Sequence, residues 1–409
     1  MMNRILILTF FAFLFSFKSF AQIETQIYKD VAFLADDKLE GRSTGTKGEK
    51  AAADYIAKRF QEIGLEPKGT NGYFQDFTFK PKTHPHGKIK FTDSIGKKTL
   101  TGRNVVGFIN NHAPYTVVIG AHYDHLGYGD EGSLYRGKKV QIHNGADDNA
   151  SGVGVLLDLA KKLQGANTRN NYIIMSFSGE EMGLLGSNYF VKHATLSLDS
   201  VNYMLNMDMV GRLKKDNALA VYGVGTSPYF KQVVEAYGNK FKLIEKESGV
   251  GPTDHTSFYL NDIPVLHFFT GQHEDYHRPS DDYDKLNYKG MELISRYIFD
   301  IVTDLDDNGK MSFRKTKNES DKTPRFKVTL GVVPDYMYDG KGMRIDGVSE
   351  EKPAQKAGIK KGDVVIQLGE LKVDDMMGYM KALSKFKKGD MTTVKVLRGK
   401  EIVALKVTF

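Results

Sequence analysis

The chain of 409 residues contains no cysteine, which excludes disulfide bonds and thiolate metal ligands. Its stability must therefore come from a buried core, and any metal site must be built from histidine, aspartate and glutamate. Low-complexity tracts, internal repeats and a phosphate-binding GxxxxGK[ST] loop are also absent. The remaining composition, 41% apolar and 26% charged residues, is ordinary for a globular protein with room for two or three domains.

The net positive charge of the chain is concentrated at one end. The formal charge is +7 at pH 7, but residues 325–409 alone carry +6, while residues 22–324 carry −1. The basic side chains are spread along the C-terminal segment, which favours a solvated, lysine-rich surface over a nucleic-acid footprint. We therefore expect no nucleic-acid partner.

Residues 1–21, MMNRILILTFFAFLFSFKSFA, have the pattern of a secretory signal peptide. A short basic start precedes an apolar stretch of 13 residues, from Ile5 to Phe17. That length is short for a bilayer span, so cleavage near Ala21 is favoured over an uncleaved membrane anchor. We expect an exported protein, periplasmic or secreted, with no stable membrane insertion after cleavage.

Residues 22–303 alternate strand-like and helix-like stretches. The expected strands lie at residues 115–124, 171–181, 200–211, 218–225 and 263–271, and the expected helices at residues 47–67, 151–165, 227–241 and 287–305. Near-continuous apolar strands that alternate with helices predict an α/β sandwich with a largely parallel central sheet. The chain then turns polar, which predicts a linker at residues 304–324 and a separate module at residues 325–409.

Several expected strands end in side chains that commonly bind metals. In an open parallel sheet the carboxyl ends of the strands share one edge, so these side chains are expected to meet there. The candidates are His122 and Asp124, Asp147 and Asp148, Glu180 and Glu181, Asp208, and His273 and His277. The adjacent Glu180 and Glu181 repel each other, and residues 171–187 offer no lysine or arginine to neutralise them.

Each candidate also has a structural interpretation. Asp147 and Asp148 could cap the helix that follows them, and Glu180 and Glu181 could begin a helix whose dipole stabilises them. Loops favour polar residues in any case. These interpretations weaken because all the candidates fall at one edge of the same expected sheet.

Five stretches, taken in order, resemble the co-catalytic di-zinc aminopeptidase family, the secreted bacterial leucyl-type aminopeptidases and their relatives. They are AHYDH, GADDNASG, FSGEEMGLLGS, NMDMVG and YHRPSDD. The resemblance covers residues 25–303. It implies a three-layer α/β/α sandwich with a mixed, mostly parallel central sheet, and two Zn²⁺ ions as cofactors.

Carried over position by position, the resemblance implies five metal ligands. His122 and Asp208 would bind one zinc ion, and Glu181 and His277 would bind the other. Asp148, three residues before the Ser-Gly of GADDNASG, would bridge the two ions. Imidazole and carboxylate ligands suit zinc, although manganese or cobalt would also accept them.

The resemblance also implies roles for residues that do not bind metal. Asp124 would orient the His122 ring through its other nitrogen. Asp254 would line the substrate site, and the peptide bond between Asp148 and Asn149 would be cis. Two cations about 3.5–4 Å apart can share a bridging water, deprotonate it and polarise the scissile carbonyl. Glu180 would then take the proton of that water as general base and pass it to the leaving amine.

The C-terminal module, residues 325–409, resembles a PDZ domain of the bacterial type found on periplasmic proteases. The stretches KAGIKKGDVVIQLGE and VKVLRGK carry this resemblance, which implies a small β-rich domain. Leu330, Gly331 and Val332 would form a loop that receives the C-terminus of a peptide or protein. Thr329 stands where the family usually has its first glycine. An alternative is that the module packs on the first domain or aids its folding.

The function expected from these resemblances is a zinc-dependent aminopeptidase, acting on peptides with a free N-terminus, with a PDZ appendage. Alternatives on the same fold are a carboxypeptidase or dipeptidase, or a glutaminyl cyclase that uses one zinc ion. A different class is a non-catalytic peptide-binding protein. The presence of all five ligands and of Glu180 favours a two-metal hydrolase.

Overall fold

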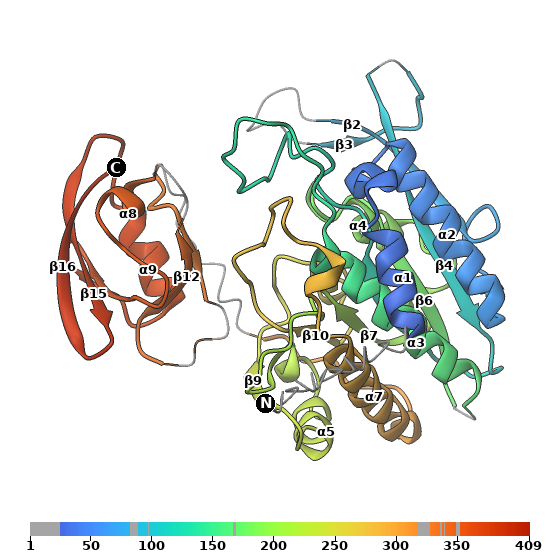
Figure 1. Cartoon of the computed structure of the whole chain (residues 1–409). Helices are drawn as coiled ribbons and strands as arrows, with labels where there is room; N and C mark the ends of the chain where they lie inside the picture. Colours follow the sequence, from blue (N-terminus) through green and yellow to red (C-terminus); the bar gives the residue numbers. More distant parts are fainter. Residues whose placement is uncertain are drawn as a thin grey trace, which may run out of the picture.

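The computed structural model describes residues 25–81, 89–96, 98–166, 169–316, 328–335, 338, 340–348 and 352–409. The predicted signal peptide lies outside the described residues. Within them, no helix is both long and apolar enough to cross a membrane. The described elements form two sheets, one of 10 strands and one of 6 strands (Figure 1).

The first sheet is built from strands in the N-terminal three quarters of the chain. Its strands are β1 (Glu66–Pro67), β2 (Phe74–Lys80), β3 (Lys90–Phe91), β4 (Leu100–Ile109), β5 (Thr116–His122), β6 (Asn171–Phe177), β7 (Val201–Met207), β8 (Ala218–Tyr222), β9 (Lys242–Lys246) and β10 (Val265–Phe269). The α-helices around it are α1 (Gln26–Leu34), α2 (Lys47–Ile63), α3 (Gly152–Gln164), α4 (Leu185–Lys192), α5 (Phe230–Tyr237), α6 (His255–Tyr259) and α7 (Tyr288–Leu305). Short helical turns are η1 (Asp37–Arg42), η2 (Ala146–Ser151), η3 (Leu198–Ser200), η4 (Val224–Thr226), η5 (Tyr283–Lys285) and η6 (Asp306–Asn308).

The strand order of this sheet is β3-β2-β4-β6-β5-β7-β10-β8-β9, with β1 paired to β4. The four central strands β6, β5, β7 and β10 are parallel to one another. The pairs towards one margin, β2 with β3, β2 with β4 and β4 with β6, are antiparallel, as is β10 with β8. The edge pair β8 with β9 is parallel again. The predicted mixed sheet is therefore confirmed, with most of its parallel pairs at the centre.

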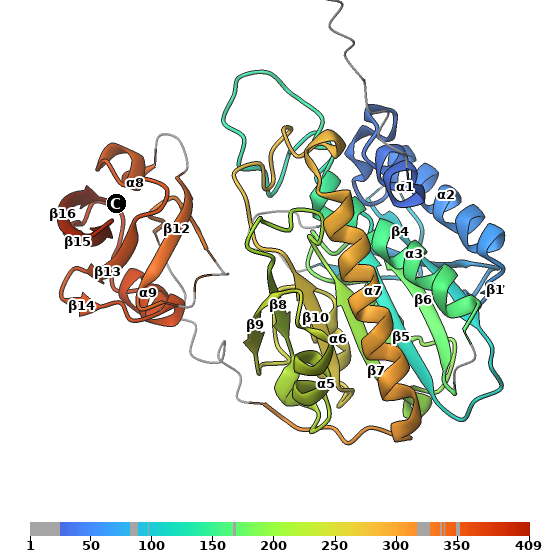
Figure 2. The same cartoon turned by 60° about the horizontal axis from the view of Figure 1, so that its bottom comes forward.

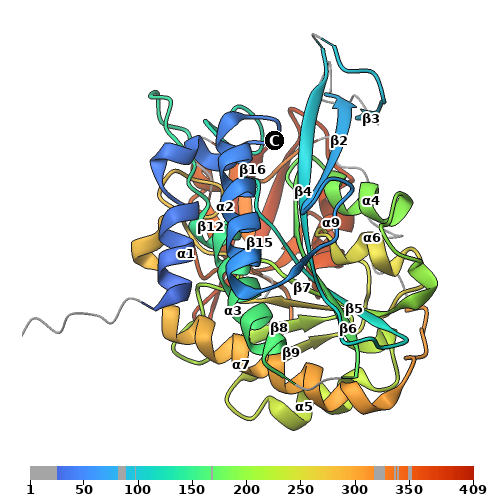
Figure 3. The ribbon, with the colours of Figure 1, turned by 90° about the vertical axis from the view of Figure 1, so that its right-hand side faces the viewer.

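Helices cover both faces of the first sheet. On one face, α1, α2, α3, α5 and α7 enclose a large apolar core that includes the strand residues Val117, Ile119 and Leu205. On the other face, α4 and α6 pack over Val118, Met175 and other strand residues of the opposite parity. Figure 3 shows α1, α2 and α3 on one side of the strands and α4 and α6 on the other, and Figure 2 shows α7 crossing the sheet beside α3. The predicted three-layer sandwich is confirmed.

The predicted helices and strands of this part are all present, with ends that local chemistry explains. In α2, the Thr46 side chain accepts the Glu49 N–H at the start, and Gly64 ends the helix with φ 93°. A left-handed residue at this position favours glycine, as expected from the sequence. The antiparallel strands β2, β3 and β4 lie in a stretch for which the sequence analysis assigned no strand.

The predicted linker, residues 304–324, begins inside α7, which ends at Leu305. The next residues are hydrogen bonded to the first sheet and its helices. Met311 donates its N–H to Asn202 Oδ1 at 2.7 Å, and Thr316 donates its N–H to a tyrosine hydroxyl of α6 at 2.8 Å. The chain is thus attached to the first sheet up to Thr316, and the exact boundary between the two domains stays a prediction.

The second sheet forms the C-terminal module. Its elements are β11 (Val332–Pro334), β12 (Met343–Val348), α8 (Pro353–Lys356), β13 (Val364–Leu368), β14 (Leu371–Lys372), α9 (Met376–Leu383), β15 (Met391–Arg398) and β16 (Glu401–Thr408). All its strand pairs are antiparallel. Its buried residues, among them Leu330, Val365, Leu383 and Val394, form an apolar core of their own. A module with its own core is expected to unfold independently of the rest.

A truncation tests this independence. Ending the chain after Thr316 should change the melting temperature of the first domain by less than about 3 °C, because it removes none of that domain's core. Ending it after Gly309 removes the hydrogen bonds of Met311 and Thr316 and should lower the melting temperature clearly. Differential scanning calorimetry measures both. A large fall in the melting temperature of the chain that ends after Thr316 would show that the two units share their stability.

Candidate metal centre

The register of the parallel strands brings the candidate residues to one edge of the sheet. His122 is the last residue of β5 and is paired with Phe177, the last residue of β6. Gly120 is paired with Asn206 of β7, so Asp208 follows its strand at the same level as His122. Glu180 and Glu181 lie just beyond the end of β6. Residues distant in the sequence therefore meet because their strands are parallel and in register.

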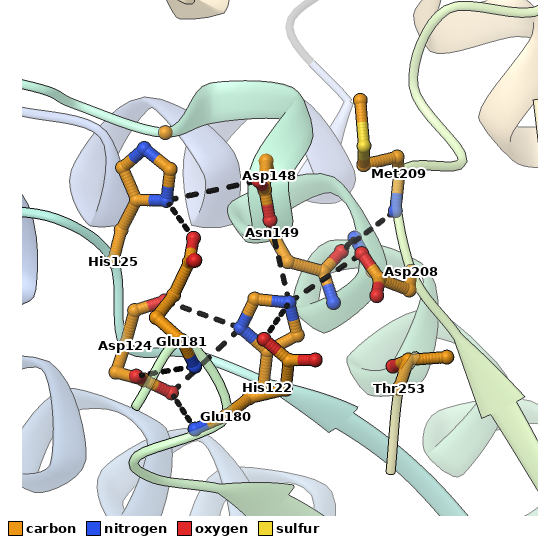
Figure 4. Close-up of polar contacts among 12 residues, drawn as sticks. His122, Asp124, His125, Asp148, Asn149, Glu180, Glu181, Asp208, Met209 and Thr253 are labelled. Atoms are coloured by element: carbon orange, nitrogen blue, oxygen red, sulfur yellow. Dashed lines mark hydrogen bonds and ion pairs between the residues drawn. The ribbon is translucent and has the colours of Figure 1, made fainter. Parts of the chain in front are cut away.

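The first group of candidate ligands surrounds the Nε2 atom of His122. This atom lies 3.3 Å from Asp148 Oδ1, 3.4 Å from Asp208 Oδ1 and 4.0 Å from Glu180 Oε2. The imidazole is buried, and its Nε2 has no hydrogen-bond partner among the described residues. Figure 4 shows His122, Asp148 and Asp208 pointing towards one another.

The second group lies on the other side of Asp148. His277 Nε2 is 3.1 Å from Asp148 Oδ2 and 3.3 Å from Glu181 Oε2. Asp148 thus turns one carboxylate oxygen to each group, Oδ1 to His122 and Oδ2 to His277. Oxygen and nitrogen atoms that ligate a tetrahedral zinc ion at about 2.0–2.1 Å lie roughly 3.3 Å apart, so both groups fit zinc.

Both histidines are held by a hydrogen bond from the other ring nitrogen. His122 Nδ1 donates to the main-chain oxygen of Asp124 at 3.2 Å, and His277 Nδ1 donates to that of Gly132 at 2.9 Å. A proton on Nδ1 leaves the Nε2 lone pair free, which is the form that binds a metal. In each group, therefore, a main-chain carbonyl fixes the imidazole in the tautomer that a metal requires.

The Asp124 carboxylate holds main chain next to the His122 ring. Its Oδ1 lies 3.7 Å from His122 Nδ1, an ion-pair contact beyond hydrogen-bond range, and the hydrogen bond of this nitrogen goes to the Asp124 main-chain oxygen. The predicted role of Asp124 in orienting the His122 ring stays a prediction. The carboxylate accepts the N–H groups of Glu180 and Glu181 at 3.1 and 3.4 Å, and the Thr44 hydroxyl at 3.1 Å. It thereby fixes the turn that presents both glutamates.

A second buried carboxylate holds the turn that contains Asp148. Asp281 accepts the N–H groups of Asp147 and Asp148 at 3.0–3.1 Å. The predicted cis peptide bond between Asp148 and Asn149 is confirmed. Asp147 turns away from the centre, accepts the Gly211 N–H at 2.7 Å and contacts His273 Nε2 at 3.1 Å. His273 therefore lies behind the site and not in it.

The electrostatics of the site reflect an excess of buried carboxylates. Burial lowers the pKa of His122, but Asp208 and Glu180 outweigh it and raise that pKa well above the usual value. Burial likewise opposes the charge on His277, yet Glu181 and Asp148 raise the pKa of His277 to about 11. Burial and nearby acids such as Asp208 raise the pKa of Glu180 well above its ordinary value. This surplus of negative charge needs cations, and the donor set fits a pair of zinc ions.

Asp254 faces the same site from the start of α6. It is fully buried, and neither of its carboxylate oxygens has a hydrogen-bond partner among the described residues. Burial, together with the charges of Asp124 and Asp208, raises the pKa of Asp254 to about 7, even though His122 opposes the shift. An unpaired buried carboxylate at this place is suited to a cationic group that arrives with a ligand.

Sequence analysis missed Arg42, a fully buried arginine behind the site. Its guanidinium donates to the main-chain oxygens of Tyr123 at 2.6 Å, Asn144 at 2.6 Å, Gly145 at 3.0 Å and also Leu34. Burial lowers the pKa of Arg42 to about 10, although nearby acids favour its charge. One side chain thus ties the end of η1 to the segments on either side of the candidate ligands. No local pattern in the sequence reveals this role.

His125, the second histidine of AHYDH, was also missed. It is buried, and its Nδ1 lies 2.8 Å from Glu181 Oε1 and 3.9 Å from Asp148 Oδ2 (Figure 4). His125, Asp148 and Glu181 together form one of two clusters of metal-ligating atoms within the described part of the chain, and His122, Glu180 and Asp208 form the other. The stretch AHYDH contained the signal, but the family pattern uses only its first histidine.

In the C-terminal module, some main-chain groups of the predicted peptide loop are hydrogen bonded within the module itself. Leu330 is buried, and its main-chain oxygen accepts the Ala354 N–H at 2.8 Å. Gly331 has φ 77° and donates its N–H to Thr329 Oγ1 at 3.1 Å. Val332 starts strand β11. The threonine hydroxyl therefore occupies an amide that a bound carboxylate would otherwise use.

Comparison with known proteins agrees with this geometry. Residues 104–302 match the profile described as Peptidase family M28, and residues 311–409 match that of the PDZ domain. A probable leucine aminopeptidase of Arthroderma benhamiae is 33% identical over 174 residues, which cover 39% of this chain. The chain spans only 44% of that relative's length.

Two solved structures share the fold. A zinc aminopeptidase from Bacillus subtilis is 17% identical with a TM-score of 0.53, and the match covers 70% of this chain and 97% of that one. A glutaminyl cyclase from Porphyromonas gingivalis is 19% identical with a TM-score of 0.54, covering 68% and 97%. The chain therefore contains a peptidase family M28 segment at residues 104–302, followed by a PDZ segment at residues 311–409.

The role of Arg42 in assembling this domain can be tested by substitution. Arg42→Met leaves four main-chain oxygens without their donor, at about 1–3 kcal/mol each, and should lower the melting temperature by about 10 °C. The exposed Arg136→Met is the control and should leave the melting temperature unchanged. Calorimetry measures both. An unaltered melting temperature in Arg42→Met would show that the arginine does not hold these segments together.

Proposed function

We propose that the first domain is a zinc-dependent aminopeptidase that removes N-terminal residues from peptides. The observation that carries the proposal is the orientation of Asp148, which turns one oxygen to His122 and the other to His277. A carboxylate shared between two ligand groups is suited to a pair of ions. We assign His122, Asp208 and Asp148 to one ion, and His277, Glu181 and Asp148 to the other.

When bound, two zinc ions supply Lewis acidity, which polarises the scissile carbonyl and makes water a nucleophile near neutral pH. Glu180 is assigned as the general base. Its carboxylate is 4.0 Å from His122 Nε2, further than the other acids of that group, so it is free to hold a proton. It would accept the proton of the attacking water at its carboxylate and return it to the leaving amine. The hydrogen bonds from Glu180 and Glu181 to Asp124 fix this position.

Recognition of the free N-terminus is assigned to Asp254. Its carboxylate is buried beside Asp208 and His122, and neither oxygen has a hydrogen-bond partner among the described residues. The ammonium group of a peptide would supply both the missing charge and the missing donors. This assignment favours an aminopeptidase over a carboxypeptidase on the same fold, because a carboxypeptidase needs a cation at the corresponding place.

Two other functions are compatible with the fold. One is a glutaminyl cyclase that uses one zinc ion, since one structural neighbour of this chain is a glutaminyl cyclase. The second ligand group, around Glu181 and His277, favours two ions instead. A non-catalytic peptide-binding protein is disfavoured because every ligand and Glu180 are present. We further propose that the protein is exported, and that the PDZ domain binds a peptide or protein C-terminus at Leu330, Gly331 and Val332.

The test of the function is mass spectrometry of a defined peptide mixture incubated with the protein, with and without a chelator. Peptides shortened stepwise from the N-terminus, blocked by the chelator and absent when the N-terminus is acetylated, are the expected result. Trimming from the C-terminus would indicate a carboxypeptidase, and cyclisation of N-terminal glutamine would indicate a cyclase. No change in any peptide would leave only the binding function.

Glu180→Gln tests the general base. The amide keeps the shape of the side chain but cannot accept the proton, so turnover should fall by at least about 100-fold while two metal ions per chain remain bound. Activity on a chromogenic amino-acid amide and metal analysis by mass spectrometry give the two readings. The exposed Glu235→Gln serves as the control. Retained activity in Glu180→Gln would exclude this residue as the base.

Asp148→Ala tests the shared ligand. Both ions should be lost together, because the carboxylate contributes an oxygen to each ligand group. Metal content after dialysis measures this directly. If only one ion is lost, Asp148 serves a single group and the bridging assignment is wrong.

A further inference from the structure

Glu49, in the first turn of α2, is a buried acid that belongs to neither group of candidate ligands. Its exposed fraction is 2%, and burial raises the pKa of its carboxyl to about 7, although hydrogen bonds from Ser178 and Gly45 oppose the shift. A buried carboxylate is costly unless its hydrogen bonds are satisfied, so its place in the fold calls for an explanation. Glu49 also lies ahead of residues 104–302, which match the peptidase profile.

Capping of α2 accounts for only one oxygen of this carboxylate. An acid at the third position of a helix commonly returns its side chain to the main chain before the helix, and Glu49 Oε2 accepts the Gly45 N–H at 2.7 Å. The other oxygen, Oε1, faces the sheet. It accepts the Arg103 N–H of β4 at 3.2 Å and the Ser178 hydroxyl, and it lies 3.2 Å from the Tyr123 hydroxyl.

Two of these contacts reach the turns that carry the site. Tyr123 stands between His122 and Asp124 at the end of β5, and Ser178 follows β6 two residues before Glu180. The two turns meet where Glu180 donates its N–H to the Asp124 carboxylate at 3.1 Å. Glu49 therefore holds, from behind, both of the turns that place the assigned general base.

The segment around Ser178 is closely packed. Ser178 donates its N–H to Asn104 Oδ1 at 3.2 Å, and its main-chain oxygen accepts the Gly186 N–H at 2.8 Å. A Cβ added at Gly186 would lie 2.4 Å from that oxygen. A single residue, Gly179 with φ 71°, separates Ser178 from Glu180. The position of Ser178 thus sets the direction in which the chain reaches Glu180, and without Glu49 its buried hydroxyl would lose its acceptor.

We propose that Glu49 is a positioning residue of the reaction, which acts through Ser178 and Tyr123 on the placement of Glu180. The inference rests on the proposed function, because it concerns the base of that reaction. The hydrogen bonds of Glu49 go to the scaffold and not to the candidate ligands. Its loss should therefore slow the chemical step and leave metal content and substrate binding unchanged, since a small displacement of a general base lowers the rate steeply.

Glu49→Gln tests the proposal. The amide keeps the size of the side chain, but whichever way it turns, its NH₂ group faces a main-chain N–H, that of Gly45 or that of Arg103. The kcat for a chromogenic amino-acid amide should fall about 10-fold, with KM changed less than about 2-fold and two metal ions still bound. Ser178→Ala should lower kcat similarly. The double variant should lose no more than either single variant, because both substitutions break the same contact.

Hydrogen exchange followed by mass spectrometry gives a reading that does not depend on activity. In either single variant, residues 178–186 should exchange about 5-fold faster, the factor that the loss of one hydrogen bond gives, while α7 stays unchanged. The control is Glu62→Gln, the same chemical change at an exposed position near the other end of α2. It should alter neither kcat nor exchange.

An unchanged kcat in both Glu49→Gln and Ser178→Ala would overturn the proposal. Faster exchange that extends to α7, with kcat unaltered, would also overturn it, because this is the effect of a general loss of stability. If Glu49→Gln does not fold, Ser178→Ala decides by the same two readings. An unmodified chain that hydrolyses no peptide would overturn the proposed function and the inference together, whereas an active chain with fully active variants would overturn the inference alone.

Discussion

The structure of the site depends on the repulsion among acids that are buried at one edge of a parallel sheet. Asp148, Glu181 and Asp208 lie within a few ångströms of two imidazoles, and burial denies them the water that would otherwise screen their charge. The histidines offset part of this repulsion. Burial opposes the charge of both Asp148 and Glu181, yet His122 and His277 hold the pKa of Asp148 well below its usual value, and His277 and His125 lower the pKa of Glu181 to about 2. Bound cations would stabilise the buried acids further, which would couple metal binding to the stability of this edge.

Main-chain groups, rather than side chains, do most of the positioning. Two carbonyl oxygens set the tautomers of His122 and His277, and the Asp124 carboxylate receives the amides of both glutamates. Arg42 also positions main chain, behind the site, where its guanidinium donates to four carbonyl oxygens in three segments of the chain. Because these contacts hold the backbone, a small shift of a loop would displace the candidate ligand that the loop carries. Burial of the supporting residues limits such shifts.

Much of the site could be predicted from the sequence because its residue types stand at strand ends. Apolar runs followed at once by His122, Glu180 and Asp208 indicate both the sheet and its functional edge, and the structure has β5, β6 and β7 where they were expected. Arg42 and His125 could not be predicted in this way. Three of the four main-chain oxygens that Arg42 binds, those of Tyr123, Asn144 and Gly145, are 81 to 103 residues away along the chain, and such contacts leave no periodic signal.

The sequence by itself determined the class of fold, the order of the elements and the set of metal-binding residue types, since these follow from local hydrophobic pattern and from residues adjacent to strands. The resemblance already assigned the bridging role to Asp148 and not to Asp147. Only the tertiary structure decided which oxygen of Asp148 faces which histidine, that Asp147 accepts the Gly211 N–H, and that the Asp124 carboxylate accepts the Glu180 N–H. The reason is physical. The direction in which each carboxylate oxygen points depends on the register of the parallel strands and on the conformation of each turn, and no local sequence pattern encodes either.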